Sequence, residues 1–227
     1  MTTVEAKEST ARDLNEKVVC MVSGGIDSPV AAWLLARAGY QPVFAYFDNN
    51  PLSDETTKRR ALESIAKVMK HWPGQTARVY IVPHGENLVE LIMKCPRKLT
   101  CILCRRLMLR VAEKIAIAEG AAAIVTGEIL GEHASQTLYN LASENSATML
   151  PILRPLIGMN KTEVERIARR IGTFDISTKP ASCCRAAPKR PRTKSRTEEI
   201  STAESRIDLS SMTDRAFKCV RVEQIGL

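Results

Sequence analysis

The chain has 227 residues and a mass of 25.1 kDa, which is enough for one domain or for one domain with a tail. Its composition, with 44% apolar, 26% charged and 4% aromatic residues, is typical of a globular protein. No apolar run reaches the ~18 residues that a membrane span requires, and the polar start of the chain is unlike a signal peptide. These features exclude membrane, secreted and fibrous proteins and predict a cytoplasmic one.

Net charge is +8, and the densest excess of positive charge lies between residues 185 and 196, where six Lys or Arg occur in twelve residues without an acid. Such a block attracts polyanions, of which nucleic acid is the commonest in a cytoplasm. A solvated basic tail is the alternative. The predicted RNA contacts of this block are Arg185, Lys189, Arg190, Arg192, Lys194 and Arg196.

Along the chain, apolar runs alternate with segments of helical spacing. The apolar runs predict five buried strands, at residues 18–22, 42–47, 77–83, 121–127 and 148–156. The helices expected between and after them span residues 29–38, 54–70 (with Ser53 as the cap), 87–94, 105–119, 133–142 and 161–171. Prolines in the fifth run place that strand near an edge of the sheet or at its own end. Strands that are apolar throughout and alternate with helices indicate an α/β fold, a doubly wound parallel sheet of about five strands.

The predicted domain organisation has three parts. Residues 1–16 form a polar lead-in, residues 17–185 form the α/β domain, and residues 186–227 form a basic tail with local order around residues 207–222.

The segment SGGIDSP, directly after the first predicted strand, has the residues of a phosphate-binding loop. Gly24 and Gly25 let backbone N–H groups approach an anion, and Ser23 and Ser28 add hydroxyl donors at a helix N-terminus. Asp27 would repel phosphate unless Mg²⁺ intervened, so we expect it to contact the metal. The loop is neither a Walker loop nor a dinucleotide fingerprint. A purely structural Gly-Gly turn is the alternative, and it leaves the Ser, Asp and Ser unexplained.

This loop resembles the pyrophosphate (PP) loop of the adenine-nucleotide alpha-hydrolase enzymes, which cut ATP between its alpha and beta phosphates. Four later segments, CRRLMLRVAEKIA, TGEILGEHASQTLYNL, LRPLIGMNKTEVERIARRIGT and CCRAAPKRPRTKS, are similar in order to motifs of the tRNA 4-thiouridine synthetase (ThiI) family. The similarity covers residues 18–195. It implies an ATP- and Mg²⁺-dependent enzyme that adenylates a uridine carbonyl in tRNA, releases pyrophosphate and lets sulfur displace AMP. It also implies a link to synthesis of the thiamine thiazole.

The same resemblance implies the site residues. The catalytic groups would be Asp27, Arg105, Lys161 and Cys184. Arg105 and Lys161 would stabilise the charge on the alpha phosphate as pyrophosphate leaves, and Cys184 would carry the sulfur, with Arg185 favouring its thiolate. The implied ATP contacts are Met21, Val22, Ser23, Gly24, Gly25, Asp27, Ser28, Tyr46, Phe47, Arg105, Gly127 and Gln136.

Seven cysteines without a secretion signal indicate metal binding or thiol chemistry in a reducing compartment. Cys101 and Cys104 form a CxxC pair, and with Cys184 they would supply three ligands to an iron–sulfur cluster whose open iron carries sulfide. Cys183 is the alternative third ligand. A redox CxxC that resolves a persulfide on Cys184 and a structural zinc are the competing hypotheses.

The family normally carries an RNA-binding THUMP domain before this domain, and some members carry a rhodanese domain after it; neither fits within the 227 residues. We therefore expect tRNA to be bound by the basic block, by a separate RNA-binding subunit or across a homodimer. The sulfur donor would be sulfide or the persulfide of a cysteine desulfurase. Two other functions stay open: a small-molecule ATP pyrophosphatase or sulfurtransferase that does not act on RNA, and the nucleotide-binding subunit of a two-protein tRNA-modifying complex.

Overall fold

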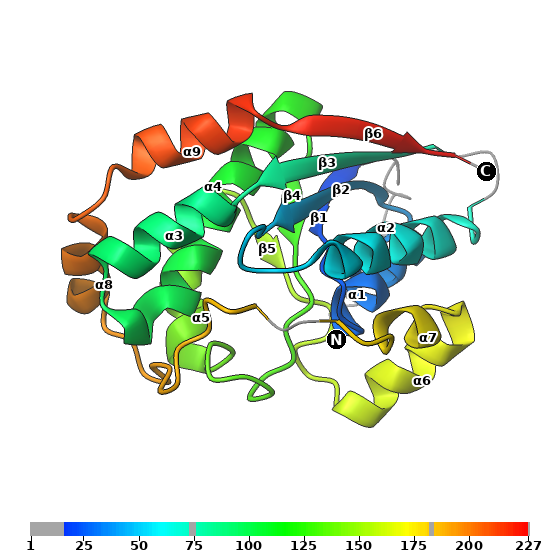
Figure 1. Cartoon of the computed structure of the whole chain (residues 1–227). Helices are drawn as coiled ribbons and strands as arrows, with labels where there is room; N and C mark the ends of the chain where they lie inside the picture. Colours follow the sequence, from blue (N-terminus) through cyan, green and yellow to red (C-terminus); the bar gives the residue numbers. More distant parts are fainter. Residues whose placement is uncertain (1–15, 73–75, 182–183, 227) are drawn as a thin grey trace, which may run out of the picture.

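The computed structural model describes residues 16–72, 76–181 and 184–226. At its centre is a six-stranded sheet in the order β5-β4-β1-β2-β3-β6 (Figure 1). Strands β1 to β5 pair in parallel, and β6 is antiparallel to β3. The strands are β1 (Lys17–Met21), β2 (Gln41–Asp48), β3 (Ala77–Pro83), β4 (Ala123–Val125), β5 (Ile152–Leu153) and β6 (Arg221–Ile225).

Helices cover both faces of the sheet. Because side chains alternate along a strand, β1 sends Val18 and Cys20 into one core and Val19 and Met21 into the other. The first core packs against α1 (Asp27–Arg37), α2 (Glu55–Met69) and α6 (Lys161–Ile171), and the second packs against α4 (Thr100–Glu119) and α9 (Leu209–Lys218). Burial on both sides is the reason that the strand sequences are apolar throughout, and the predicted doubly wound α/β fold is confirmed.

Several helices and strands begin or end at residues other than those predicted. Helix α4 begins at Thr100, five residues before the predicted start, so the CxxC pair lies in its first turns. Asp54, and not Ser53, caps α2, because its carboxylate accepts the Thr57 N–H at 3.0 Å. Strand β5 has two residues and lies at the sheet edge, as the flanking prolines predicted. The remaining helices are α3 (Gly85–Lys94), the 3₁₀ turn η1 (Arg97–Leu99), α5 (Leu138–Asn145) and α7 (Phe174–Ser177).

The prediction of a tail at residues 186–227 is wrong for the described residues 186–226, although the local order expected around residues 207–222 is present as α9 and β6. This part of the chain contains α8 (Thr197–Glu204), α9 and β6, and β6 extends the sheet beside β3. Ile200, Ala203 and Met212 fill a third apolar cluster against α3 and α4. The apolar residues of this region are few and are spaced among Lys, Arg, Ser and Thr, which hides the helical pattern in the sequence.

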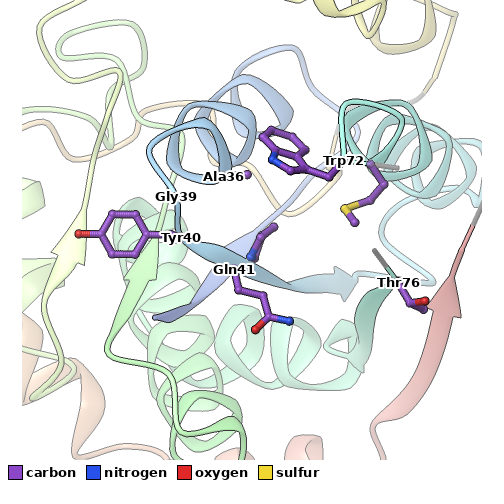
Figure 2. Close-up of a pocket in the computed structure, with 8 residues that line it drawn as sticks. Ala36, Gly39, Tyr40, Gln41, Trp72 and Thr76 are labelled. Carbon is purple, nitrogen blue, oxygen red and sulfur yellow. The ribbon is translucent and has the colours of Figure 1, made fainter. Parts of the chain in front are cut away.

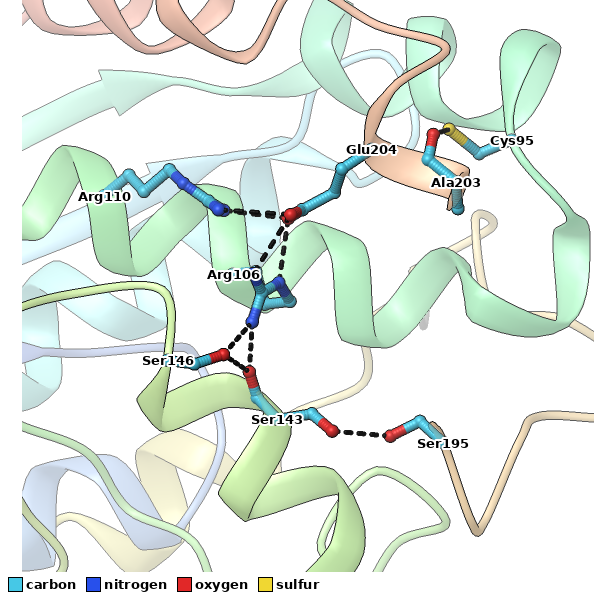
Figure 3. Close-up of polar contacts among 8 residues, drawn as sticks. All are labelled: Cys95, Arg106, Arg110, Ser143, Ser146, Ser195, Ala203 and Glu204. Carbon is cyan, nitrogen blue, oxygen red and sulfur yellow. Dashed lines mark hydrogen bonds and ion pairs between the residues drawn. The ribbon is translucent and has the colours of Figure 1, made fainter. Parts of the chain in front are cut away.

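A polar network fastens α8 to the rest of the domain (Figure 3). Glu204 accepts hydrogen bonds from Arg106 at 2.8 Å and from Arg110 at 3.0 Å, both on α4. Arg106 also donates to the Ser146 hydroxyl at 2.8 Å and to the Ser143 carbonyl in α5. One guanidinium therefore joins α4, α5 and α8, which makes the C-terminal region an integral part of the fold.

Two further features bear on where a ligand can bind. In the part of the chain that the structure describes, no helix combines the length and apolar character needed to cross a lipid bilayer. A pocket of about 420 Å³ opens where β2 begins, between Tyr40 and Trp72 (Figure 2). None of the predicted site residues lines it, since they follow the opposite, carboxyl ends of the strands.

Candidate active site

A second pocket, of about 260 Å³, lies where β1, β2 and β4 end. In doubly wound sheets, ligands bind in the crevice outside the carboxyl ends of the strands. Ten of the twelve predicted ATP contacts line this pocket, and the other two, Gly24 and Tyr46, do not. The lining residues are Met21, Val22, Ser23, Gly25, Asp27, Ser28, Phe47, Arg105, Met108, Thr126, Gly127, Glu128, His133 and Gln136.

Tyr46 and Phe47 project from opposite faces of β2, so only one of them can reach the pocket. Phe47 lines it, whereas Tyr46 is buried with α1 and α2, and this burial raises the pKa of its phenol. The two-residue period of the strand therefore keeps the Tyr46 side chain out of this pocket. Gly24 faces α2 and not the pocket, because a Cβ at this position would lie 2.8 Å from the Thr57 carbonyl oxygen.

The two serines of the PP loop shape it into a turn at the start of α1. The Ser23 N–H donates to the Ser28 hydroxyl at 2.8 Å, and the Gly25 N–H donates to the Ser23 hydroxyl at 3.2 Å. Asp27 is the first residue of α1, so the positive end of the helix dipole lies at the pocket. This arrangement favours an anionic group such as a phosphate.

Lys161 crosses from the start of α6 to the start of α1. Its ammonium lies 2.8 and 3.1 Å from the two Asp27 carboxylate oxygens and 3.8 Å from Glu132. A capping box between Asn160 and Glu163 holds the first turn of α6 in place. Asp27 and Glu132 thus place carboxylate oxygens, the ligand type that Mg²⁺ prefers, around one cation.

Gly127 is the point where the loop after β4 touches the PP loop. A Cβ at this position would lie 2.8 Å from both N and Cα of Ser28. We expect Gly127→Ala to push the start of α1 away, lower the free energy of unfolding by about 1–3 kcal/mol and weaken ATP binding. Urea unfolding and calorimetric titration with ATP check this result. The control is Gly158→Ala, because a Cβ at Gly158 would meet no atom within 4 Å from the described residues beyond its chain neighbours. Equal behaviour of the two variants would contradict the prediction.

Arg105 is held between two buried carboxylates. Its Nε donates to Glu144 at 3.0 Å, and its Nη2 forms an ion pair with Glu128. The side chains of Glu144 and Glu128 are 0% and 1% exposed, and Glu128 also pairs with Arg154 at 3.2 Å and accepts the Thr126 hydroxyl. Arg105 thus lines the pocket and also neutralises the two buried carboxylates of Glu128 and Glu144. Glu128 follows Gly127 directly in the TGE segment, which is the sequence signal that could have identified it.

Sulfur-containing residues lie under the pocket. The Cys104 Sγ is 3.3 Å from the buried His84 Nε2 and 3.7 Å from the Sδ of Met108, a pocket residue. Burial raises the pKa of the Cys104 thiol. Burial also lowers the pKa of His84 to about 4, because the charged form of the imidazole is disfavoured away from water. Burial first, and then the charge of Cys184, raise the pKa of Cys101, so these thiols are close enough to interact electrostatically.

The described residues do not supply a metal site of three or more protein ligands. Within residues 16–72, 76–181 and 184–226, no three His, Cys, Asp or Glu side chains are grouped so that they could hold a metal ion. Cys183, the alternative third ligand, lies outside the described residues. The geometry therefore does not support a cluster on Cys101, Cys104 and Cys184, and we derive no step through one.

The different exposure of the cysteines predicts different rates of thiol alkylation. Cys184 and Cys219 are exposed, whereas Cys20 is buried and Cys104 has its pKa raised by burial. We expect iodoacetamide at neutral pH to label the exposed pair at least about tenfold faster, because the thiolate is the reactive form. Mass spectrometry of timed digests checks this order. If Cys104 is labelled as fast as Cys184 in the native protein, the prediction is contradicted. As a control, unfolding in urea should make the labelling rates of the two cysteines equal.

The family described as "Thiamine biosynthesis protein (ThiI)" matches residues 14–209. The chain belongs to the ThiI family. This confirms the predicted family and its PP-loop domain.

Two relatives carry the same name. A "Probable tRNA sulfurtransferase" from Methanosarcina mazei is 42% identical over 206 residues, which are 91% of this chain and 51% of the relative. One of the same name from Caldanaerobacter subterraneus is 41% identical over 202 residues, 88% of this chain and 53% of the relative. The chain thus spans about half the length of the curated relatives it matches.

Solved structures agree with the fold. The crystal structure of a 4-thiouridine synthetase–RNA complex with bound ATP is 38% identical, with a TM-score of 0.89, over 92% of this chain and 55% of that chain. The structure of the NMN synthetase from Francisella tularensis is 14% identical and has a TM-score of 0.57, over 88% of this chain and 76% of that chain. At this identity the similarity shows a shared fold and no more.

Proposed function

We propose that this chain is the adenylating domain of an ATP-dependent tRNA sulfurtransferase that makes 4-thiouridine. The observation that carries this proposal is the pocket where the PP loop, Arg105 and Gln136 converge, with the Lys161–Asp27 ion pair at its rim. Its similarity to the domain of a 4-thiouridine synthetase crystallised with RNA and ATP supports the choice of ATP and tRNA as substrates.

The pocket provides different surroundings for the base and for the phosphates. Val22, Phe47 and Met108 are apolar groups suited to the adenine ring, and the unpartnered Oε1 of the buried Gln136 can accept a hydrogen bond from a ligand. The PP loop N–H groups and the start of α1 would receive the phosphates. Mg²⁺ bound with ATP would neutralise phosphate charge, and Asp27, which lines the pocket, would hold it.

The first chemical step would be attack of the uridine O4 on the alpha phosphorus of ATP. The bond from that phosphorus to the bridging oxygen breaks, pyrophosphate leaves, and O4 becomes bonded to AMP. Lys161, freed from Asp27 when the nucleotide binds, would stabilise the charge that develops on the phosphates.

The second step would replace oxygen with sulfur. A persulfide on Cys184, formed when a cysteine desulfurase transfers the outer sulfur of its own persulfide, would attack C4, and AMP would leave with the original O4. A thiol of the CxxC pair would then attack the Cys184 sulfur, form a disulfide and release 4-thiouridine; an external thiol would reduce this disulfide. The place of the CxxC pair, in the first turns of α4 with Cys104 beside the pocket residue Met108, supports this redox role. When sulfide is the donor, it would attack C4 directly and displace AMP without a persulfide. The description of the family supports thiamine thiazole synthesis as a second use of the same sulfur transfer.

The test is incubation with unmodified tRNA, Mg²⁺-ATP and sulfide without oxygen. Pyrophosphate release and the near-ultraviolet absorbance of 4-thiouridine should appear together and should both be lost in Asp27→Ala. Pyrophosphate release that ignores tRNA would favour a small-molecule pyrophosphatase. Activity that appears only after an RNA-binding protein is added would favour the two-protein complex.

A further inference from the structure

The basic segment of residues 184–196, called here the basic strap, is fastened to α5. Asn140, which is 0% exposed, donates from Nδ2 to the Ala134 and Arg192 carbonyls, both at 2.8 Å, and accepts the Ser195 N–H at 3.1 Å. The Ser143 and Ser195 hydroxyls lie 2.9 Å apart. With so many contacts to one helix, the strap holds its side chains at defined positions.

The strap presents five of its six cations to solvent. Arg192 donates to Glu199 at 3.0 and 3.2 Å, so its charge is neutralised. The other five are exposed, and among the residues that the structure describes none of them has an acidic partner. They are Arg185, Lys189, Arg190, Lys194 and Arg196. Such a row of cations suits the phosphate backbone of a nucleic acid.

An exposed aromatic ring lies beside this row. Tyr139, in the first turn of α5, is 55% exposed, and the Lys194 ammonium lies 4.5 Å from the centroid of its ring. The neighbouring Leu138 is 68% exposed. Helix α5 starts two residues after Gln136, which lines the ATP pocket, and the strap starts at Cys184. Helix α5, which carries the Tyr139 ring, and the strap beside it are therefore both continuous in sequence with residues of the candidate active site, Gln136 and Cys184.

We infer that Tyr139 is a stacking platform for an unpaired base of the bound RNA, while the exposed cations of the strap hold the phosphates around that base. This inference rests on the proposed function, since tRNA is the substrate proposed there. An aromatic side chain next to a cationic groove is the combination that binds single-stranded nucleic acid, because every base has a face that can stack. A ring in such a position would bind an open, unpaired segment in preference to a duplex.

The test measures binding of fluorescein-labelled tRNA at several salt concentrations. Tyr139→Ala should weaken binding at least about fivefold, with an unchanged slope of log affinity against log salt, because no charge is removed. Tyr139→Phe, which keeps the ring, should bind like wild type. Arg190→Gln, by contrast, should reduce the salt slope by about one. Leu138→Ala is the matched control, since it removes an exposed apolar neighbour that cannot stack.

Three outcomes would overturn the inference. The first is wild-type affinity of Tyr139→Ala for tRNA. The second is equal loss in Tyr139→Phe. The third is a change of oligomeric state, by size-exclusion chromatography, in both Tyr139→Ala and Leu138→Ala, which would assign this surface to a protein partner.

Two readouts separate this inference from the proposed function. Wild type that makes 4-thiouridine, together with Tyr139→Ala of unchanged tRNA affinity, would overturn only the inference. Wild type that neither binds tRNA nor makes 4-thiouridine would overturn the proposed function and the inference with it. Unchanged ATP affinity in Tyr139→Ala shows that the variant is folded.

Discussion

Replacing Arg105 with alanine is expected to lower the free energy of unfolding by about 3–5 kcal/mol. The guanidinium is the cation shared by Glu144 and Glu128, whose side chains are buried. After its removal, Glu144 has no ion pair within 4 Å among the described residues, and Glu128 keeps only the one with Arg154. A buried carboxylate without a counter-charge is costly, because neither water nor another charge stabilises it. Urea unfolding followed by circular dichroism measures the loss.

The matched control for this prediction is Arg110→Ala on the same helix. Arg110 is 21% exposed, and its partner Glu204 keeps the hydrogen bonds from Arg106. We expect this variant to lose about 1 kcal/mol or less. Arg105→Lys should fall between the two, because one ammonium lacks the planar fork that reaches both carboxylates. Equal stability of the two alanine variants would contradict the structural role of Arg105.

Replacing Lys161 with alanine is expected to slow tRNA-dependent pyrophosphate release by about 10²–10³-fold. The ammonium lies at the pocket rim, 2.8 Å from Asp27, where it can turn to the phosphates when a nucleotide binds. Charge on the phosphates grows as pyrophosphate leaves, so the loss should fall on kcat rather than on KM for ATP. Steady-state kinetics with tRNA in excess separates the two constants.

Lys179→Ala is the control for Lys161. Lys179 is also a half-exposed lysine in an ion pair, with Glu63 at 2.6 Å, but it does not line the pocket. Its removal should leave kcat near the wild-type value. A Lys161→Ala enzyme with normal kcat and a raised KM would show that the ammonium binds ATP in the ground state only.

Local sequence was sufficient for the parts of the fold that depend on neighbouring residues. Uniformly apolar runs indicated buried parallel strands, and Gly172 marked the end of a helix because it takes a left-handed φ of 75°. The PP loop was recognisable because Gly24, Gly25 and their serines are consecutive. Each of these features arises within a few residues, so composition and spacing predict it.

Contacts between distant segments were decided by the tertiary structure. The β6 strand joins the sheet only because β3 offers it an edge, and the Lys161–Asp27 pair links residues 134 positions apart. The same holds for the carboxylates around Arg105 and for the strap on α5. No local pattern encodes these partners, since they depend on which elements the folded chain brings together.

By itself, then, the sequence determined the α/β class, the ThiI family and most of the residues that line the candidate active-site pocket, because these depend on local patterns and on the spacing within motifs. Only the tertiary structure decided that Tyr46 lies in the core, that Arg105 neutralises buried carboxylates and that the basic segment is an ordered strap. Those properties follow from burial and from pairing across the fold, which neighbouring residues in the chain do not reveal.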